Sequence, residues 1–172
     1  MRVLLSRLFS FFEKVEDSMS GESDISIAVK WRMEHELIVG LCQNVIKAYM
    51  ANNRMQIKSN LKKLNYALTD HFLEEDTQLY SVCKQDLLTD TIIKDMNDYR
   101  EKYRDNKVRI LSNLSIYALP DKALDEVFFE GFNSIYAELM DLFKIEETSL
   151  YIHMEEQCIC QRTMIVNEVV ED

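Results

Sequence analysis

Residues that form turns are scarce in this chain, which has one proline and three glycines among 172 residues. A protein built from many β-strands needs such residues at most of its connections, so this composition argues against a β fold. It favours a few long helices that are joined by short connections. The length suits one domain with a sizeable core.

Positive charge is also scarce, because 20 lysines and arginines face 30 aspartates and glutamates, for a formal net charge of −10. A surface this acidic argues against binding to a phosphate backbone, since a nucleic-acid-binding protein needs a basic stripe. We therefore expect no nucleic-acid partner. Any protein partner should present a basic or neutral surface.

Long apolar runs are missing as well. No run approaches the roughly 20 residues that are needed to cross a bilayer, and the first fifteen residues lack the small-x-small cleavage site of a signal peptide. The four cysteines do not follow the spacing of a disulfide framework. Together these absences predict a protein of the reducing cytoplasm and make association with a membrane an unfavoured interpretation.

Apolar residues recur at helical spacing along most of the chain. We expect a short amphipathic helix and a polar linker at 1–24, a bundle at 25–157 and a tail at 158–172. Within the bundle, the pattern predicts four long helices at Ile25–Ala51, Arg54–Cys83, Leu88–Ala118 and Asp121–Glu156. Short loops make consecutive helices antiparallel, so the expected fold is all-α, an up-down-up-down four-helix bundle.

Several residues suit the expected helix ends. Ser23 or Asp24 could cap the first long helix, and Pro120 suits the first turn of the fourth. Two interpretations of the N-terminal helix at 1–24 remain open. It folds back onto the bundle, or it forms an arm that docks on a membrane surface or a partner, although its few basic residues weaken the membrane version.

Thirteen residues of the second helix recur in the fourth. Leu68–Tyr80 reads LTDHFLEEDTQLY and Leu139–Tyr151 reads LMDLFKIEETSLY, with seven identical positions at an offset of 71 residues. Such an internal repeat predicts two helical hairpins that are related by a pseudo-twofold axis.

Four side chains that can bind metal interrupt the apolar stripes: His35, His71, Glu75 and Glu146. His71 and Glu75 are four residues apart and therefore share a helix face. A carboxylate in a core is costly unless it is paired or ligated, and two facing carboxylates repel each other without a cation between them. Because imidazole and carboxylate together suit iron, manganese or zinc, the pattern predicts a metal site inside the bundle.

The same segments resemble the hemerythrin-like, or HHE cation-binding, domain over about residues 25–154. The resemblance is carried by EHEL at 34–37, DHFLEEDTQLY at 70–80 and FKIEETSLY at 143–151. It implies a non-haem di-iron site bridged by two carboxylates, and a function in binding oxygen or in sensing oxygen, nitric oxide or redox state. Transferred position by position, it assigns His35 and His71 as ligands and Glu75 and Glu146 as the bridging carboxylates.

The second half of the chain departs from the family's pattern. At the offset of 71 residues, His35 corresponds to Asn106 and His71 corresponds to Leu142. The histidines that would hold a second iron are therefore missing, whereas every ligand of the first iron is present.

Three interpretations of the metal site follow from this asymmetry. The favoured one is a single ion, iron above all, bound by the two histidines and two glutamates, with Glu138 or Tyr103 as possible substitute ligands for a second ion. The next is a protein that has lost its metal and kept these side chains. The last is a complete di-iron centre.

Two functions are therefore expected, and both are those of a bacterial, cytoplasmic protein that is not an enzyme. The first is a hemerythrin-like sensory or regulatory domain with iron and a small gas or peroxide as ligand. The alternative is a metal-free bundle that regulates by contact with a basic or neutral partner, similar in outline to the regulator-of-sigma-D family. An oxidase-like or peroxidase-like activity at an open iron position ranks third, because no substrate pocket is evident.

Overall fold

The computed structural model describes residues 26–83 and 90–152, so the predicted helix at 1–24 and the tail at 158–172 lie outside the described residues. Four helices fill these ranges: α2 (Ile27–Met50), α3 (Arg54–Cys83), α4 (Asp90–Ala118) and α5 (Glu126–Ile145), which continues into a π-helical turn, η1 (Glu146–Leu150). The described ranges contain no strand. The prediction of an all-α four-helix bundle is therefore confirmed.

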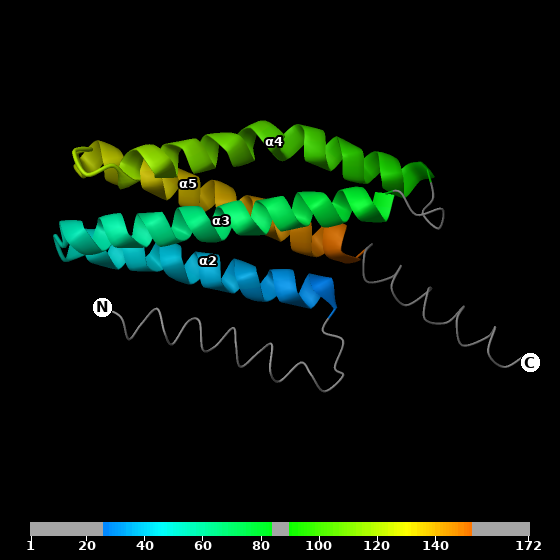
Figure 1. The fold of residues 1–172 in the computed structure, drawn as a ribbon, viewed down its shortest axis with the longest axis horizontal. Helices are drawn as coiled ribbons and strands as arrows, with labels where there is room; N and C mark the ends of the chain where they lie inside the picture. Colours follow the sequence, from blue (N-terminus) through cyan, green and yellow to red (C-terminus); the bar gives the residue numbers. More distant parts are fainter. Residues whose placement is uncertain (1–25, 84–89, 153–172) are drawn as a thin grey trace, which may run out of the picture.

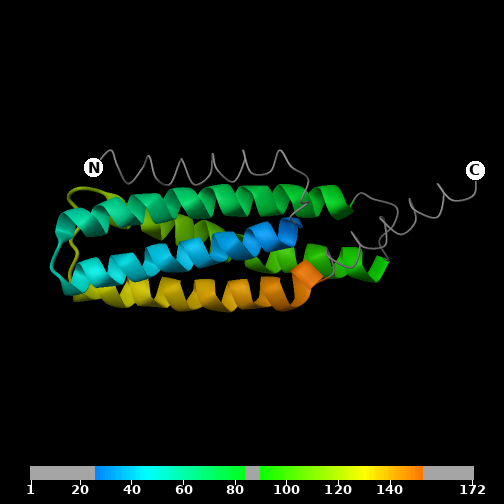
Figure 2. The ribbon, with the colours of Figure 1, turned by 90° about the horizontal axis from the view of Figure 1, so that it is seen from below.

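Consecutive helices run in opposite directions along the long axis of the molecule (Figure 1). α3 packs against both α2 and α4, and α2 also contacts α5. The turned view shows that the α2–α3 and α4–α5 connections lie at the same end of the bundle (Figure 2). The pseudo-twofold relation between the two hairpins stays a prediction.

The first helix begins and ends at residues that satisfy its free backbone groups. Ser26 caps α2 by accepting a hydrogen bond from the Val29 N–H, so the helix begins two residues later than predicted and the cap is neither Ser23 nor Asp24. α2 ends before Asn52, which has a φ of 51°. Asparagine tolerates this left-handed conformation, which is common just after a helix.

The fourth helix begins at Glu126, five residues later than predicted. Asp125 caps it by accepting a hydrogen bond from the Phe128 N–H at 3.0 Å, and a side-chain cap of this kind favours a helix start. Pro120 consequently lies in the α4–α5 connection and not in a first helical turn, so that prediction is wrong. Lys58 Nζ of α3 donates to three carbonyl oxygens at the end of α4 and in this connection, those of Tyr117, Leu119 and Lys122.

One apolar core runs through the bundle and draws on all four helices. Its largest fully buried members include Trp31, Ile38, Leu61, Leu64, Leu68, Met96, Ile110, Leu114, Phe128 and Phe132. The spacing of three or four residues that places these side chains inside also places His35, His71 and Glu146 inside. Within the described ranges, no helix combines the length and the apolar character that are needed to span a bilayer.

Candidate metal centre

Buried charged side chains are concentrated at one place in the core. Six polar or charged residues of the described ranges are buried, and five of them lie in one cluster: His35, His71, Glu75, Lys107 and Glu146. Glu75 and Glu146 are both 0% exposed. Because a buried charge is costly without a compensating partner, the contacts within this cluster decide what it can do.

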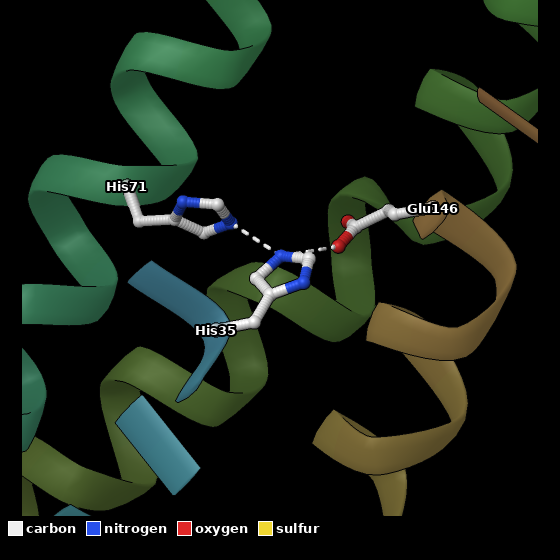
Figure 3. Close-up of side chains that lie close together, drawn as sticks. All are labelled: His35, His71 and Glu146. Atoms are coloured by element: carbon white, nitrogen blue, oxygen red, sulfur yellow. Dashed lines mark hydrogen bonds and ion pairs between the residues drawn. The ribbon is translucent and has the colours of Figure 1, made fainter. Parts of the chain in front are cut away.

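His35 of α2 and His71 of α3 point toward each other, and their Nε2 atoms are 3.0 Å apart (Figure 3). The two rings meet edge to face, with their centroids 4.7 Å apart. The ring of Phe143 stacks on His35 at a centroid distance of 3.8 Å. Packing therefore holds the Nε2 atoms of the two imidazoles next to each other.

The other nitrogen of each ring is held by a carboxylate. His35 Nδ1 lies 2.7 Å from Glu147 Oε1, and His71 Nδ1 lies 2.9 Å from Glu34 Oε2. An ionised carboxylate only accepts hydrogen bonds, so in neutral rings both protons are on Nδ1. The two Nε2 lone pairs then face each other, which is how carboxylates orient histidines that bind metal.

Glu146 brings a carboxylate oxygen to the same point. Its Oε2 lies 3.2 Å from His35 Nε2 and accepts no hydrogen bond, whereas its Oε1 accepts one from the Tyr99 hydroxyl. Ligand atoms of His35, His71 and Glu146 all lie within 4.8 Å of one another. A small side-chain movement would bring them to the spacing set by bonds of roughly 2.0–2.2 Å to one ion. The orphaned oxygen and the facing lone pairs therefore fit a transition-metal ion.

The backbone widens into the π-helical turn η1 where Glu146 lies. The Tyr151 N–H bonds to the Glu146 carbonyl five residues back, so these two side chains share a face that a regular α-helix would split. Tyr151 is fully buried, and its hydroxyl lies 3.1 Å from His35 Nε2 and donates to Glu75 Oε1 at 3.1 Å. The π-turn thus brings Glu146 and Tyr151 to the same imidazole.

Lys107 of α4 places a positive charge beside the two buried glutamates. Its Nζ lies 2.6 Å from Glu75 Oε2 and 3.8 Å from Glu146 Oε1. Two neighbouring carboxylates repel each other without a cation between them, and Lys107 supplies that cation. Asn106, the predicted counterpart of His35, is exposed. The inward position on α4 is therefore one residue further along the chain.

These charges shift the proton affinity of the cluster. Burial would lower the pKa of His35, but Glu146 and Glu147 outweigh it and raise that pKa. Burial and the charge of Glu146 raise the pKa of Glu75 to about 8, against the effect of Lys107. Burial would also raise the pKa of Glu146, but His35 and Lys107 hold it below its ordinary value. Glu146 therefore favours its ionised form, whereas His35 and Glu75 bind a proton more readily than an ordinary histidine or glutamate.

Three of the four predicted ligands meet at one point, namely His35, His71 and Glu146. The fourth, Glu75, lies beside them, but its two oxygens are engaged by Lys107 and Tyr151. Glu75 thus accepts hydrogen bonds from Lys107 and Tyr151 in the metal-free arrangement.

The two predicted substitute ligands, Glu138 and Tyr103, line an open hollow of about 510 Å³ between α4 and α5. Glu138 pairs with Arg109 and is partly exposed. Asn106 and Leu142 also line this hollow. The two positions where the resemblance would require histidines therefore hold a neutral amide and an apolar side chain beside an open space.

Four residues of the site are not among those predicted from the sequence: Glu34, Lys107, Glu147 and Tyr151. Tyr151 carried a signal, because it is one of the identical positions of the repeat. Lys107 precedes the buried Ile110 and Leu114 at helical spacing. Sequence patterns do not predict a lysine in the core, because lysines are rarely buried unless they are paired. Glu34 and Glu147 each adjoin a residue of the predicted site, and only the side-chain geometry shows that they hold the imidazoles.

Comparison with known proteins gives no relative: no protein-family model, no curated protein and no solved structure matches the chain.

Proposed function

We propose that this protein binds one iron ion through His35, His71 and Glu146, and that it is a hemerythrin-like sensory or regulatory domain for oxygen, nitric oxide or redox state. The observation that carries the proposal is the pair of Nε2 atoms 3.0 Å apart, next to a buried Glu146 oxygen without a donor. Imidazole nitrogens and a carboxylate oxygen are a donor set that suits iron. The resemblance of the repeated segments to hemerythrin-like domains supports the same metal.

Lys107 supports one ion rather than two. In the related di-iron arrangement, both carboxylates would bridge to a second ion, whereas here the ammonium group of Lys107 lies within 2.6 Å of Glu75 and 3.8 Å of Glu146. A second cation beside this ammonium would be repelled. The second half of the repeat also has no histidine to offer at Asn106 or Leu142.

The positions of the three ligands support a regulatory role. His35 lies on α2, His71 on α3 and Glu146 at the end of α5 (Figure 3). Binding of one ion would join three helices, so occupancy would change how firmly the end of α5 is held. We propose that a cytoplasmic partner responds to this change, and that the role is regulatory and not catalytic.

The test is the metal content of the full chain, purified from iron-supplemented cells and measured by plasma mass spectrometry. We expect about one iron per chain, and His71→Ala should remove it because one of the two imidazoles is lost. The third histidine, His153, offers a matched control, since His153→Ala should keep the iron. Metal far below one ion per chain in the unaltered protein would overturn the proposal.

A second candidate function is a metal-free regulator that acts by contact with a basic partner. The raised pKa of His35 favours it, because a proton on this ring could bridge to Glu146 in place of an ion. The net charge of −10 suits a basic partner. Co-purification of a basic protein with both the unaltered chain and His71→Ala would support this candidate, and stoichiometric iron that His71→Ala removes would exclude it.

A further inference from the structure

Tyr151 is close enough to the candidate metal centre to be part of it. Its hydroxyl oxygen lies 3.1 Å from His35 Nε2, next to the distances of 3.0 Å from this atom to His71 Nε2 and 3.2 Å to Glu146 Oε2. Two atoms that bind one ion at right angles, each at roughly 2.1 Å, are separated by roughly 3 Å. The phenol oxygen therefore has the spacing of a ligand.

His35 Nε2 has more neighbours than it can satisfy by hydrogen bonding. A ring nitrogen carries either one proton or one lone pair, yet three polar atoms surround it at 3.0–3.2 Å. A hydrogen bond can account for one of them. A cation bound by His35 Nε2 and these three atoms would account for all three contacts.

The second tyrosine at the cluster has a different environment. Tyr99 donates to Glu146 Oε1, the oxygen that faces away from the histidines. Tyr151 instead donates to Glu75 Oε1, an acceptor that lies outside the set of three ligands. Of these two tyrosines, Tyr151 alone combines contact with a ligand nitrogen and an acceptor for its proton.

We propose that Tyr151 is the fourth ligand and that the centre binds ferric iron through two imidazoles, one carboxylate and one phenolate. This inference rests on the proposed function and adds a ligand and an oxidation state to it. On binding of Fe³⁺, the phenol O–H bond breaks, the oxygen binds the ion, and the proton passes to Glu75 Oε1, which already accepts its hydrogen bond. A phenolate is a hard anionic donor and therefore favours the ferric ion.

The test is the visible absorption spectrum of the full chain loaded with Fe³⁺ from ferric citrate, recorded with the iron content. A ferric phenolate has a charge-transfer band in the visible range. We expect this band in the unaltered protein, and we expect Tyr151→Phe to lose it while iron is retained by the other three ligands. Tyr99→Phe is the matched control: it also removes one buried phenol hydroxyl, but that hydroxyl contacts Glu146 Oε1 and no imidazole nitrogen, so the band should persist.

Resonance Raman spectroscopy of the unaltered protein is a second test, and it does not depend on the folding of a variant. Excitation into the band should enhance ring vibrations of tyrosine, which shift when the protein contains ring-deuterated tyrosine. Three outcomes would overturn the role of Tyr151 and leave the proposed function in place. They are one iron per chain without the band, a band that persists in Tyr151→Phe, and a band that disappears only in Tyr99→Phe. A protein that binds no iron overturns both.

Discussion

Each imidazole of the candidate centre is positioned by a carboxylate behind it. Glu34 and Glu147 hold the Nδ1 atoms of His71 and His35, so the Nε2 atoms are aimed at one another without any ion present. Side chains that are already oriented lose little freedom when they bind a ligand. The two imidazoles would therefore need little reorientation to bind an ion.

We predict that Glu34→Gln weakens iron binding by about 10- to 100-fold, which is the usual effect of removing such a carboxylate. The amide keeps the size of the side chain but loses the charge that orients His71. Competition with a chelator of known affinity measures the change. Glu36→Gln is the control, because Glu36 is exposed on the same helix. Equal affinities of the two variants would contradict the prediction.

A second prediction concerns Lys107, which is 5% exposed and neutralises Glu75. Lys107→Met leaves a buried carboxylate without its partner, and removal of one member of a buried pair costs about 3 kcal/mol. Urea unfolding in the presence of a chelator measures the loss. Adding Glu75→Gln should restore part of the stability, because the uncompensated charge is then gone.

The matched variant for this prediction is Lys94→Met on the exposed side of α4. It should change the free energy of unfolding by less than about 0.5 kcal/mol. If the two lysine variants were equally stable, Lys107 would not be the partner on which the glutamates depend.

At the scale of the elements, the two copies of the repeat share seven residues but differ in backbone. The first copy lies in a regular helix, α3, whereas the second passes through the π-helical turn η1. Helical periodicity predicts which residues face inward, but it assumes 3.6 residues per turn. A π-turn changes that register at one position, so the approach of Tyr151 to His35 could not be predicted from spacing alone.

The prediction of helix boundaries from the sequence is limited in a similar way. The apolar pattern places both ends of α2, the start of α3 and the end of α4 to within two residues of those observed. The start of α5 is displaced because the Asp125 cap and the carbonyls bound by Lys58 define the connection. Such contacts depend on neighbouring helices and leave no periodic signal.

A third prediction compares two helical glycines. A Cβ added at Gly40 meets no atom within 4 Å, whereas one added at Gly131 comes 2.5 Å from the Tyr117 hydroxyl oxygen. Gly40→Ala should stabilise the protein by about 1 kcal/mol through helix propensity. Gly131→Ala should gain less or destabilise, because Tyr117 must move.

Thermal unfolding of a small variant set checks this comparison. Without the Tyr117 hydroxyl, the nearest atom to the added Cβ is the ring carbon Cζ at 3.6 Å, an ordinary contact. In a Tyr117→Phe background, Gly131→Ala should therefore stabilise like Gly40→Ala. A Gly131→Ala variant that is as stable as Gly40→Ala in the unaltered background would show that α4 and α5 pack less closely here.

At the scale of the whole molecule, the fold was predictable because it depends on features that are visible along the chain: few turn residues, long apolar stripes and a repeat. The position of the candidate site was predictable for the same reason, since His35, His71 and Glu146 interrupt those stripes. The contacts of Lys107 and Glu75 were not, because they depend on how α4 lies against α3.

A fourth prediction follows from the three helices that the ligands join. Iron should raise the free energy of unfolding by about 2.7 kcal/mol when free iron is 100-fold above its dissociation constant. Differential scanning calorimetry with and without iron measures the accompanying rise in Tm. The increase should be absent in His71→Gln, and an equal rise in this variant would place the ion elsewhere.

Lys107 also affects how the bundle behaves when no ion is bound. Its ammonium group offsets negative charge on Glu75 and Glu146, so the cluster is hydrogen-bonded even when no metal is bound. The empty bundle should then remain folded and soluble, unlike small metalloproteins that unfold when their metal is removed. In the proposed regulatory role, a bundle that stays folded with and without metal would allow a reversible response, and Lys107 would be the residue that stabilises the metal-free state.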